Sequence, residues 1–296
     1  MKAPAPASLK GFFCLVSTGG LVGVTIVIAG LAIRSGWHPI AFLLWSALGG
    51  GLVLVAVACA TAERLKLSAA LLRYGLLSGL LSFALPNMLS FLSIPHVGAG
   101  FVSLCLAFPP LLTYGLAVPL RLDRFSTKGA AGMTLGLGGA ALLAASRPGG
   151  VDGGWIWTGI ALTVPVIVAT GNIYRTVDWP GNASPRLLAP IMLLAAAAIT
   201  GVYAVFTDIP LNPETWDESA SALLAAQMTI IAATYALFFA LQKHSGPIGV
   251  SQIGWISAGA GKLLAVAFLG EAFPAILPFA FLFILAGVVL VSRRAR

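Results

Sequence analysis

Long apolar runs fill the chain from about residue 10 to residue 292, and short stretches with charges, proline or glycine separate them. Because a helix needs roughly 20 mostly apolar residues to cross a bilayer, this pattern predicts ten membrane-spanning helices. Their expected ranges are 11–33, 40–61, 68–91, 97–119, 127–146, 154–174, 187–207, 219–241, 248–269 and 274–292. The first run exceeds the roughly 7 to 15 apolar residues of a signal peptide, so we expect a retained helix.

The composition supports a bilayer as the solvent of this chain. Hydrophobic residues make up 59% and charged residues 9%, whereas a soluble domain carries about 25% charged residues. The net charge of +8 does not indicate nucleic-acid binding, because the basic residues stand singly between apolar runs instead of clustering on a polar face. The three cysteines lie inside apolar runs without a CxxC pair, so we expect neither disulfides nor a metal site.

The distribution of basic residues predicts how the chain sits in the membrane. Of the 17 lysines and arginines, Arg34 and Arg147 fall on one side of the predicted helices and Lys262 lies within a helix. All the others, Arg175 among them, fall on the opposite side. Because Lys and Arg flanking the helices are retained in the cytoplasm, we expect both termini to be cytoplasmic in a bacterial inner membrane. The acidic segment from Asp208 to Glu218 then faces outward.

The two halves of the chain share landmarks at a common spacing. The pairs are Pro39 with Pro185, Pro95 with Pro247, and Asp123 with Glu271, at offsets of 146, 152 and 148 residues. A period near half the chain indicates duplication, with repeats at 1–150 and 151–296. Because each repeat holds five helices, the second enters the membrane inverted. Inverted repeats around a central cavity are typical of secondary transporters.

Several short sequences resemble those of a known group of transporters. These are the apolar stretch from Pro109 to Asp123, Phe268-Leu269-Gly270-Glu271, and GNIYR at Gly171–Arg175 before Trp179-Pro180. With the ten helices in two inverted halves, the chain resembles the drug/metabolite transporter superfamily with EamA-type repeats. The resemblance implies export or exchange of small metabolites, amino acids among them. It also implies that helices four, eight and nine contribute to a central cavity.

Polar groups within the predicted helices are candidates for substrate binding. An unpaired amide in hydrocarbon costs several kcal/mol, so Asn87, Asn172 and Gln252 either bond neighbouring helices or line a wet cavity. A charge at the centre of a membrane helix costs about 2.5–3.5 kcal/mol. Lys262 therefore either binds a substrate carboxylate, titrates in proton coupling, or extends toward Glu271 at the outer interface.

Three aromatic side chains lie deeper than the expected interfaces, where they either pack in the core or form cavity walls for apolar or aromatic solutes. The full expected substrate-binding set is Asn87, Phe108, Asn172, Tyr235, Gln252, Trp255 and Lys262.

The chain carries no signature of catalysis. HExxH, a Gly-x-Ser-x-Gly elbow and a P-loop are all missing, and the three histidines are scattered. We therefore expect neither an enzyme nor a cofactor. We predict a secondary transporter that moves amino acids or related aromatic and apolar solutes by alternating access, in export or exchange. An uptake permease, a lipid flippase and a channel are the alternatives. The expected partners are a small-molecule substrate and the bilayer, and monomer and homodimer both stay open.

Overall fold

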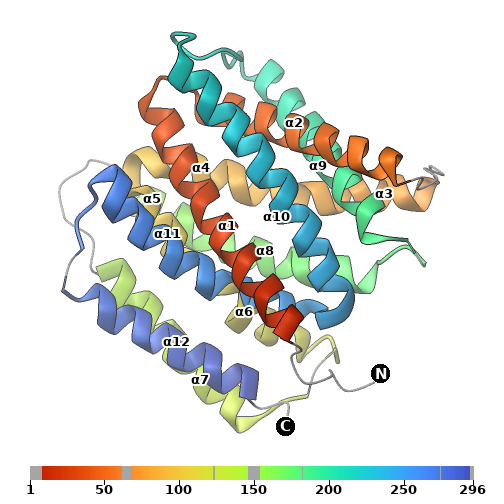
Figure 1. The fold of residues 1–296 in the computed structure, drawn as a ribbon. Helices are drawn as coiled ribbons and strands as arrows, with labels where there is room; N and C mark the ends of the chain where they lie inside the picture. Colours follow the sequence, from red (N-terminus) through yellow and green to blue (C-terminus); the bar gives the residue numbers. More distant parts are fainter. Residues whose placement is uncertain are drawn as a thin grey trace.

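The structure is a computed structural model, which describes residues 9–61, 68–122, 124–145, 154–181, 183–273 and 275–293. These residues form α-helices and one π-helical turn, η1, and contain no strand (Figure 1). The elements are α1 (Leu9–Arg34), α2 (Pro39–Ala60), α3 (Ala69–Gly79), η1 (Leu80–Ala84), α4 (Leu85–Val97), α5 (Ala99–Cys105), α6 (Pro109–Ala117), α7 (Thr127–Ala145), α8 (Gly154–Val177), α9 (Pro185–Phe206), α10 (Glu218–Ser251), α11 (Ile253–Leu269) and α12 (Leu277–Arg293).

The predicted all-α membrane class is confirmed. Among the described residues, seven helical stretches are long and apolar enough to cross a membrane, and Ile253–Leu269 and Leu277–Leu290 are shorter apolar helices. All ten expected ranges fall on one helix or on consecutive helical elements. The count of ten crossings itself stays a prediction, because length and apolarity support only seven of them directly.

The third expected helix, 68–91, is not one regular helix. Pro86 has no N–H to bond the carbonyl of Ser82, four residues earlier. The chain widens there into the π-helical turn η1, in which the N–H of Leu85 bonds the carbonyl of Leu80. Helix α4 then continues through Pro95 to Val97. The helix is therefore longer than predicted and carries a bulge where a proline interrupts its hydrogen bonds.

The fourth expected helix, 97–119, is divided into α5 and α6. Pro109 and Pro110 cannot donate to the carbonyls of Cys105 and Leu106, so the α-helix ends before them. Residues 106–108 form a tighter turn, in which the N–H of Phe108 bonds the carbonyl of Cys105 at 3.2 Å. Prolines are well accommodated at the first turn of α6, where their missing N–H groups would have had no helical partner.

The boundary expected between 241 and 248 is wrong. Helix α10 runs to Ser251, so Pro247 lies inside it, and Gln252 alone separates α10 from α11. The first half shows the same arrangement, because Gly98 alone separates α4 from α5. Near a helix end a proline costs about one hydrogen bond without ending the helix. The chain turns a few residues later, at Gly98 with a φ of 84° in the first half.

The two halves of the chain pack against each other through several pairs of helices (Figure 1). Helix α7 lies against α12, α2 against α9, and α5 against α11. Helix α1 packs on α10 and α11, just as α8 packs on α4 and α6. When each helix of the first half is exchanged for its equivalent in the second half, the same set of contacts results. Close approach relies on small residues: a Cβ added at Gly23 of α1 would lie 2.8 Å from the backbone nitrogen of Gly261 in α11.

The start of α1 and the end of α12 lie at the same end of the helical bundle, and the connection from α9 to α10 lies at the opposite end (Figure 1). This arrangement agrees with the predicted separation of the termini from the acidic segment that precedes α10.

Candidate functional site

A cavity of about 100 Å³ lies between the two halves. Helices α1, α4, α6, α8, α10 and α11, the turn η1 and Leu106 before α6 supply its lining. The described helices that surround it therefore come from both sequence repeats. The polar side chains on its walls include Ser82, Asn87, Asn172, Arg175, Thr234 and Tyr235. Most of the remaining wall is apolar and includes Ile26, Phe83, Val164, Val168, Ile231 and Phe238.

Arg175 is the charged side chain of this wall. It is only 2% exposed. Its Nε donates to Oε1 of Gln242 at 2.8 Å, and one Nη donates to Oδ1 of Asn172 at 2.6 Å. Its guanidinium carbon lies 4.6 Å from the ring centre of Phe238, which is a cation–π distance. The side chain is therefore held in place between α8 and α10.

The amide of Gln242 is itself held in orientation. Its Nε2 donates to Oγ1 of Thr176 at 3.3 Å and lies 3.5 Å from the carbonyl of Asn172. Because the amide nitrogen of Gln242 donates to groups of α8, its amide oxygen faces Arg175. The network fixes the direction of the guanidinium before any ligand arrives.

The assignment of Arg175 to a cytoplasmic connection was wrong. The expected helix ended at 174, whereas α8 runs to Val177 and keeps Arg175 within the helix and buried. Two features could have identified it: GNIYR is continuous with the apolar run, and the polar Asn172 lies one turn earlier on the same helix face.

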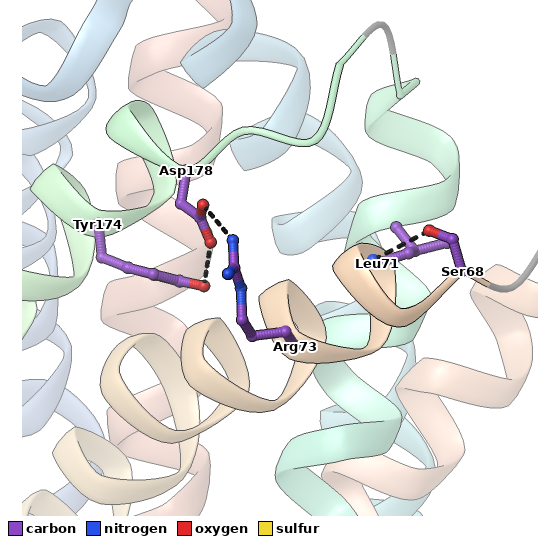
Figure 2. Close-up of polar contacts among 5 residues, drawn as sticks. All are labelled: Ser68, Leu71, Arg73, Tyr174 and Asp178. Atoms are coloured by element: carbon purple, nitrogen blue, oxygen red, sulfur yellow. Dashed lines mark hydrogen bonds and ion pairs between the residues drawn. The ribbon is translucent and has the colours of Figure 1, made fainter.

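An ion pair joins the halves near the end of α8. An Nη of Arg73, from α3, lies 2.7 Å from Oδ1 of Asp178, and the hydroxyl of Tyr174 donates to Oδ2 of Asp178 at 2.6 Å (Figure 2). The Arg73 side chain is 63% exposed. Tyr174 also stacks on Tyr74 of α3, with ring centres 5.9 Å apart. The contact between α3 and α8 therefore combines a solvated ion pair with a packed aromatic pair.

The start of α3 is capped beside this ion pair. Oγ of Ser68 accepts the N–H of Leu71 at 3.2 Å (Figure 2). Such a cap satisfies one of the free N–H groups of a helix start, so it orders the turn that carries Arg73.

A second ion pair lies within the second half, and its carboxylate contacts α5 of the first half. Nζ of Lys262 lies 3.0 Å from Oε2 of Glu271, and their side chains are 9% and 16% exposed. The Glu271 carboxylate also accepts the N–H of Gly100 at 3.0 and 3.1 Å. A Cβ at Gly100 would meet both side chains, so a larger residue there would displace this ion pair. Of the interpretations left open for Lys262, the structure shows the contact with Glu271.

The seven predicted site residues fall into two groups. Asn87, Asn172 and Tyr235 line the cavity. The other four, Phe108, Gln252, Trp255 and Lys262, do not line it. Asn87 donates to the carbonyl of Phe83 in its own helix at 2.8 Å. Binding of substrate by any of these residues stays a prediction.

Those four residues have other surroundings. Phe108 is buried in an apolar cluster with Leu104 and Leu111, and Trp255 packs against that cluster. Gln252 forms the turn between α10 and α11, next to the lining residues Ser251 and Ile253.

Ser82 is a lining residue that the sequence interpretation missed. It is 9% exposed, and its Oγ has no hydrogen-bond partner in the described part of the chain. It lies in the turn η1, and a Cβ added at Gly171 of α8 would come within 2.5 Å of its Oγ. The sequence signal that could have identified Ser82 is its place four residues before Pro86. Because Pro86 has no N–H, the Ser82 carbonyl lacks its usual helical donor.

The described residues contain no group of three or more His, Cys, Asp and Glu side chains that could hold a metal ion. The chemistry of the cavity therefore rests on hydroxyls, amides and one guanidinium.

Comparison with known proteins agrees with this architecture. Residues 9–145 match the model of the EamA-like transporter family. None of the curated proteins matches the sequence. A crystal structure, described only as that of a protein, aligns with 93% of this chain and 98% of its own length, with a TM-score of 0.66 and 18% sequence identity. At this identity the likeness shows the fold alone.

Proposed function

Because residues 9–145 belong to the EamA-like transporter family of the drug/metabolite transporter superfamily, this protein is a membrane transporter of that type, and we propose that it moves small metabolites by alternating access. The cavity between the two halves is the proposed substrate site. Residues 1–150 and 151–296 act as inverted repeats in this proposal, and the exchangeable packing pattern of their helices supports it.

The position of the two ion pairs carries the proposal. Arg73 with Asp178 connects α3 to the end of α8, and Glu271, which is paired with Lys262 of α11, accepts the N–H of Gly100 at the start of α5. Each contact joins the first half to the second. A carrier that opens to one side at a time must break contacts between its halves at one end while keeping those at the other. These ion pairs are suited to that task.

The walls and volume support a small solute with an apolar body, such as an amino acid or a related aromatic or apolar metabolite. The volume of about 100 Å³ lies below the roughly 300–1,000 Å³ of pockets for drug-sized ligands. A two-chain lipid is far larger than this cavity, which argues against a flippase. Export or exchange from a bacterial inner membrane, with the termini in the cytoplasm, is the proposed direction, and an uptake permease would use the same cavity.

Counterflow in proteoliposomes tests the proposal. Vesicles are loaded with an unlabelled amino acid or with a monocarboxylate such as 3-methylbutanoate, and the entry of the same solute in radiolabelled form is followed. A carrier accelerates entry when substrate is present on the opposite side, because the loaded transporter returns faster. Entry that is insensitive to internal substrate contradicts alternating access and favours a channel. Scrambling of a fluorescent phospholipid without solute entry favours a flippase.

A further inference from the structure

We propose that Arg175 forms an anion site in the cavity and binds the carboxylate of a small monocarboxylate with an apolar body. The proposal rests on the proposed function in taking the ligand to be the transported solute. Binding itself is measurable without transport, so the two can fail separately.

The first argument is the cost of the charge. Arg175 lies within the apolar helix Gly154–Val177 and is 2% exposed. Charged side chains in membrane segments are costly, and they mark pathways and binding sites unless they are paired. The question is therefore what neutralises this guanidinium.

The contacts of Arg175 in the structure are with neutral groups. Gln242 and Asn172 each accept one N–H, and Phe238 offers its ring face. A guanidinium has five N–H groups, so subtracting these two leaves three. Among the described residues no carboxylate forms an ion pair with Arg175. The orienting contacts are present, whereas the counter-charge is not.

The nearest acid along the helix is engaged elsewhere. Asp178 follows Arg175 by three residues, but one of its oxygens meets Arg73 and the other accepts the Tyr174 hydroxyl (Figure 2). No aspartate or glutamate is among the described residues that line the cavity. The cavity wall therefore carries a positive charge, which favours an anionic ligand.

A second, independent observation points to the same ligand. Ser82 lines the cavity, is 9% exposed, and has an Oγ without a partner in the described ranges. It packs against Gly171, one helical turn before Arg175. A hydroxyl buried without a hydrogen bond costs free energy unless a ligand accepts its proton. A carboxylate has two oxygens, so it can accept from Arg175 and from Ser82 together.

The rest of the wall defines the body of the ligand. Val164, Val168, Ile231 and Phe238 present apolar surface, and the volume of about 100 Å³ limits the size. An ammonium group would find no acidic partner on the described wall. We therefore infer that a monoanion binds better than the zwitterion of the same carbon skeleton.

Three probes of equal skeleton test the charge preference. They are 3-methylbutanoate, its neutral amide, and L-valine, which is the 2-amino derivative of the acid. Purified protein in detergent is titrated with each, by calorimetry and by thermal unfolding, since a ligand of the folded state raises the melting temperature. The acid should bind at least ~10-fold more tightly than the amide, as expected when one charge-assisted hydrogen bond is gained. It should also bind at least ~10-fold more tightly than L-valine, because the ammonium of valine would lose its water without gaining an acidic partner.

Variants then assign the preference to the site. Arg175→Gln should weaken binding of the acid by ~10-fold or more and leave the amide unchanged, and Arg175→Lys should retain part of the preference because it keeps the charge. Ser82→Ala should weaken binding of the acid by a smaller factor than Arg175→Gln does. Arg186→Gln removes an exposed arginine at the start of α9 and should leave all three affinities unchanged.

A purely structural role makes a different prediction. If Arg175 only ties α8 to α10 through Gln242, Arg175→Gln lowers the melting temperature without ligand and leaves the ratio of acid to amide affinity unchanged. The proposal is overturned if the ratio of acid to amide affinity is near one in the wild type. It is also overturned if neither Arg175 variant changes that ratio. If Arg175→Gln does not fold, Arg175→Lys and Ser82→Ala still test the ratio. Tight binding of the acid without counterflow of that acid would contradict the transport function and leave the anion site standing.

Discussion

Arg175 and Lys262 are two buried cations whose surroundings differ. Lys262 meets a carboxylate at 3.0 Å and lies outside the cavity wall. Arg175 meets neutral acceptors and forms part of that wall. A paired charge within a membrane protein serves packing between helices, whereas an unneutralised one in a cavity is suited to ligand binding. The partner of each cation, and not its burial, therefore decides its role.

The pair at Glu271 predicts a stability effect. Lys262→Met removes the cation and leaves the partly buried Glu271 without its counter-charge, which costs less than the roughly 3–5 kcal/mol of breaking a fully buried pair. We expect a clear fall in melting temperature in detergent. The double variant Lys262→Met with Glu271→Gln removes both charges and should recover most of the loss. A single variant as stable as the wild type would show that the pair contributes nothing.

His38 predicts a dependence of stability on pH. Its Nδ1 accepts the N–H of Ile40 at 3.2 Å and caps α2, and burial lowers the pKa of His38. A folded pKa below the unfolded value of about 6.5 gives stability that is present above pH 6.5 and is lost as pH falls through the folded pKa. Melting temperatures from pH 7.5 to pH 5 should fall in the wild type. His38→Asn keeps a capping oxygen without titrating, so an equally steep fall in that variant would contradict the assignment.

Single residues were predictable only where the sequence isolates them. Lys262 stands alone in a long apolar run and was found, whereas Arg175 lies close to a helix end and was counted with the flanking charges. Asn172 was found as a polar group in an apolar run, and Tyr235 was found as an aromatic residue deep within one. Trp255 and Phe108 have the same signal but pack in a separate apolar cluster, because the direction of a side chain depends on helix packing.

At the scale of elements, prolines decide where helices are interrupted. Pro86 is associated with the turn η1 and the pair Pro109-Pro110 with the division between α5 and α6, whereas Pro95 lies within the last turn of α4. A proline removes one donor in every case, and the outcome depends on whether neighbouring groups satisfy the freed carbonyl. The interruptions at η1 and at 106–108 both border the cavity, since Ser82 and Leu106 line it.

The two ion pairs predict opposite changes in access to the cavity. Asp178→Asn should open the end at α3 and α8, and Glu271→Gln the end at α5 and α11. Because Arg73 is largely exposed, its ion pair is worth about 0–1 kcal/mol. Asp178→Asn should therefore change the ratio of the two open states by at most roughly 5-fold. Access is measured by labelling Ser90→Cys, on the cavity wall, with a membrane-impermeant maleimide in vesicles of either orientation.

The background for this labelling is a chain in which the exposed Cys59 is replaced by serine. Asp178→Asn should speed labelling from the side of the α1 start, and Glu271→Gln from the opposite side. Arg186→Gln serves as the control for a charge change outside both contacts. Equal labelling from both sides in all variants would contradict a gating role for either pair.

At the scale of the whole molecule, the sequence predicted the helices better than their packing. The length of an apolar run and the charges that flank it are local properties of the sequence, so they can be identified without knowing which helices lie next to each other. Which faces meet is a different matter, because a membrane helix is apolar all round and its pattern does not separate lipid from protein. The packing of α7 on α12 and of α2 on α9 depends on small residues and local fit.

The charge asymmetry between the two ends of the bundle predicts the topology. The start of α1 and the end of α12 lie at one end, and the connection that carries Glu214 lies at the other (Figure 1). Moving Arg175 from a connection into the cavity wall removes one charge from the count, and the basic majority of the first end remains. Reporters fused after Arg296 and near Lys128 should therefore be active only in the cytoplasm, and one near Glu214 only outside. The fusion near Lys128 is decisive, because it lies at the start of α7, the last helix of the first half. An odd number of crossings between it and Arg296 would separate the two reporters and contradict the inverted five-helix arrangement.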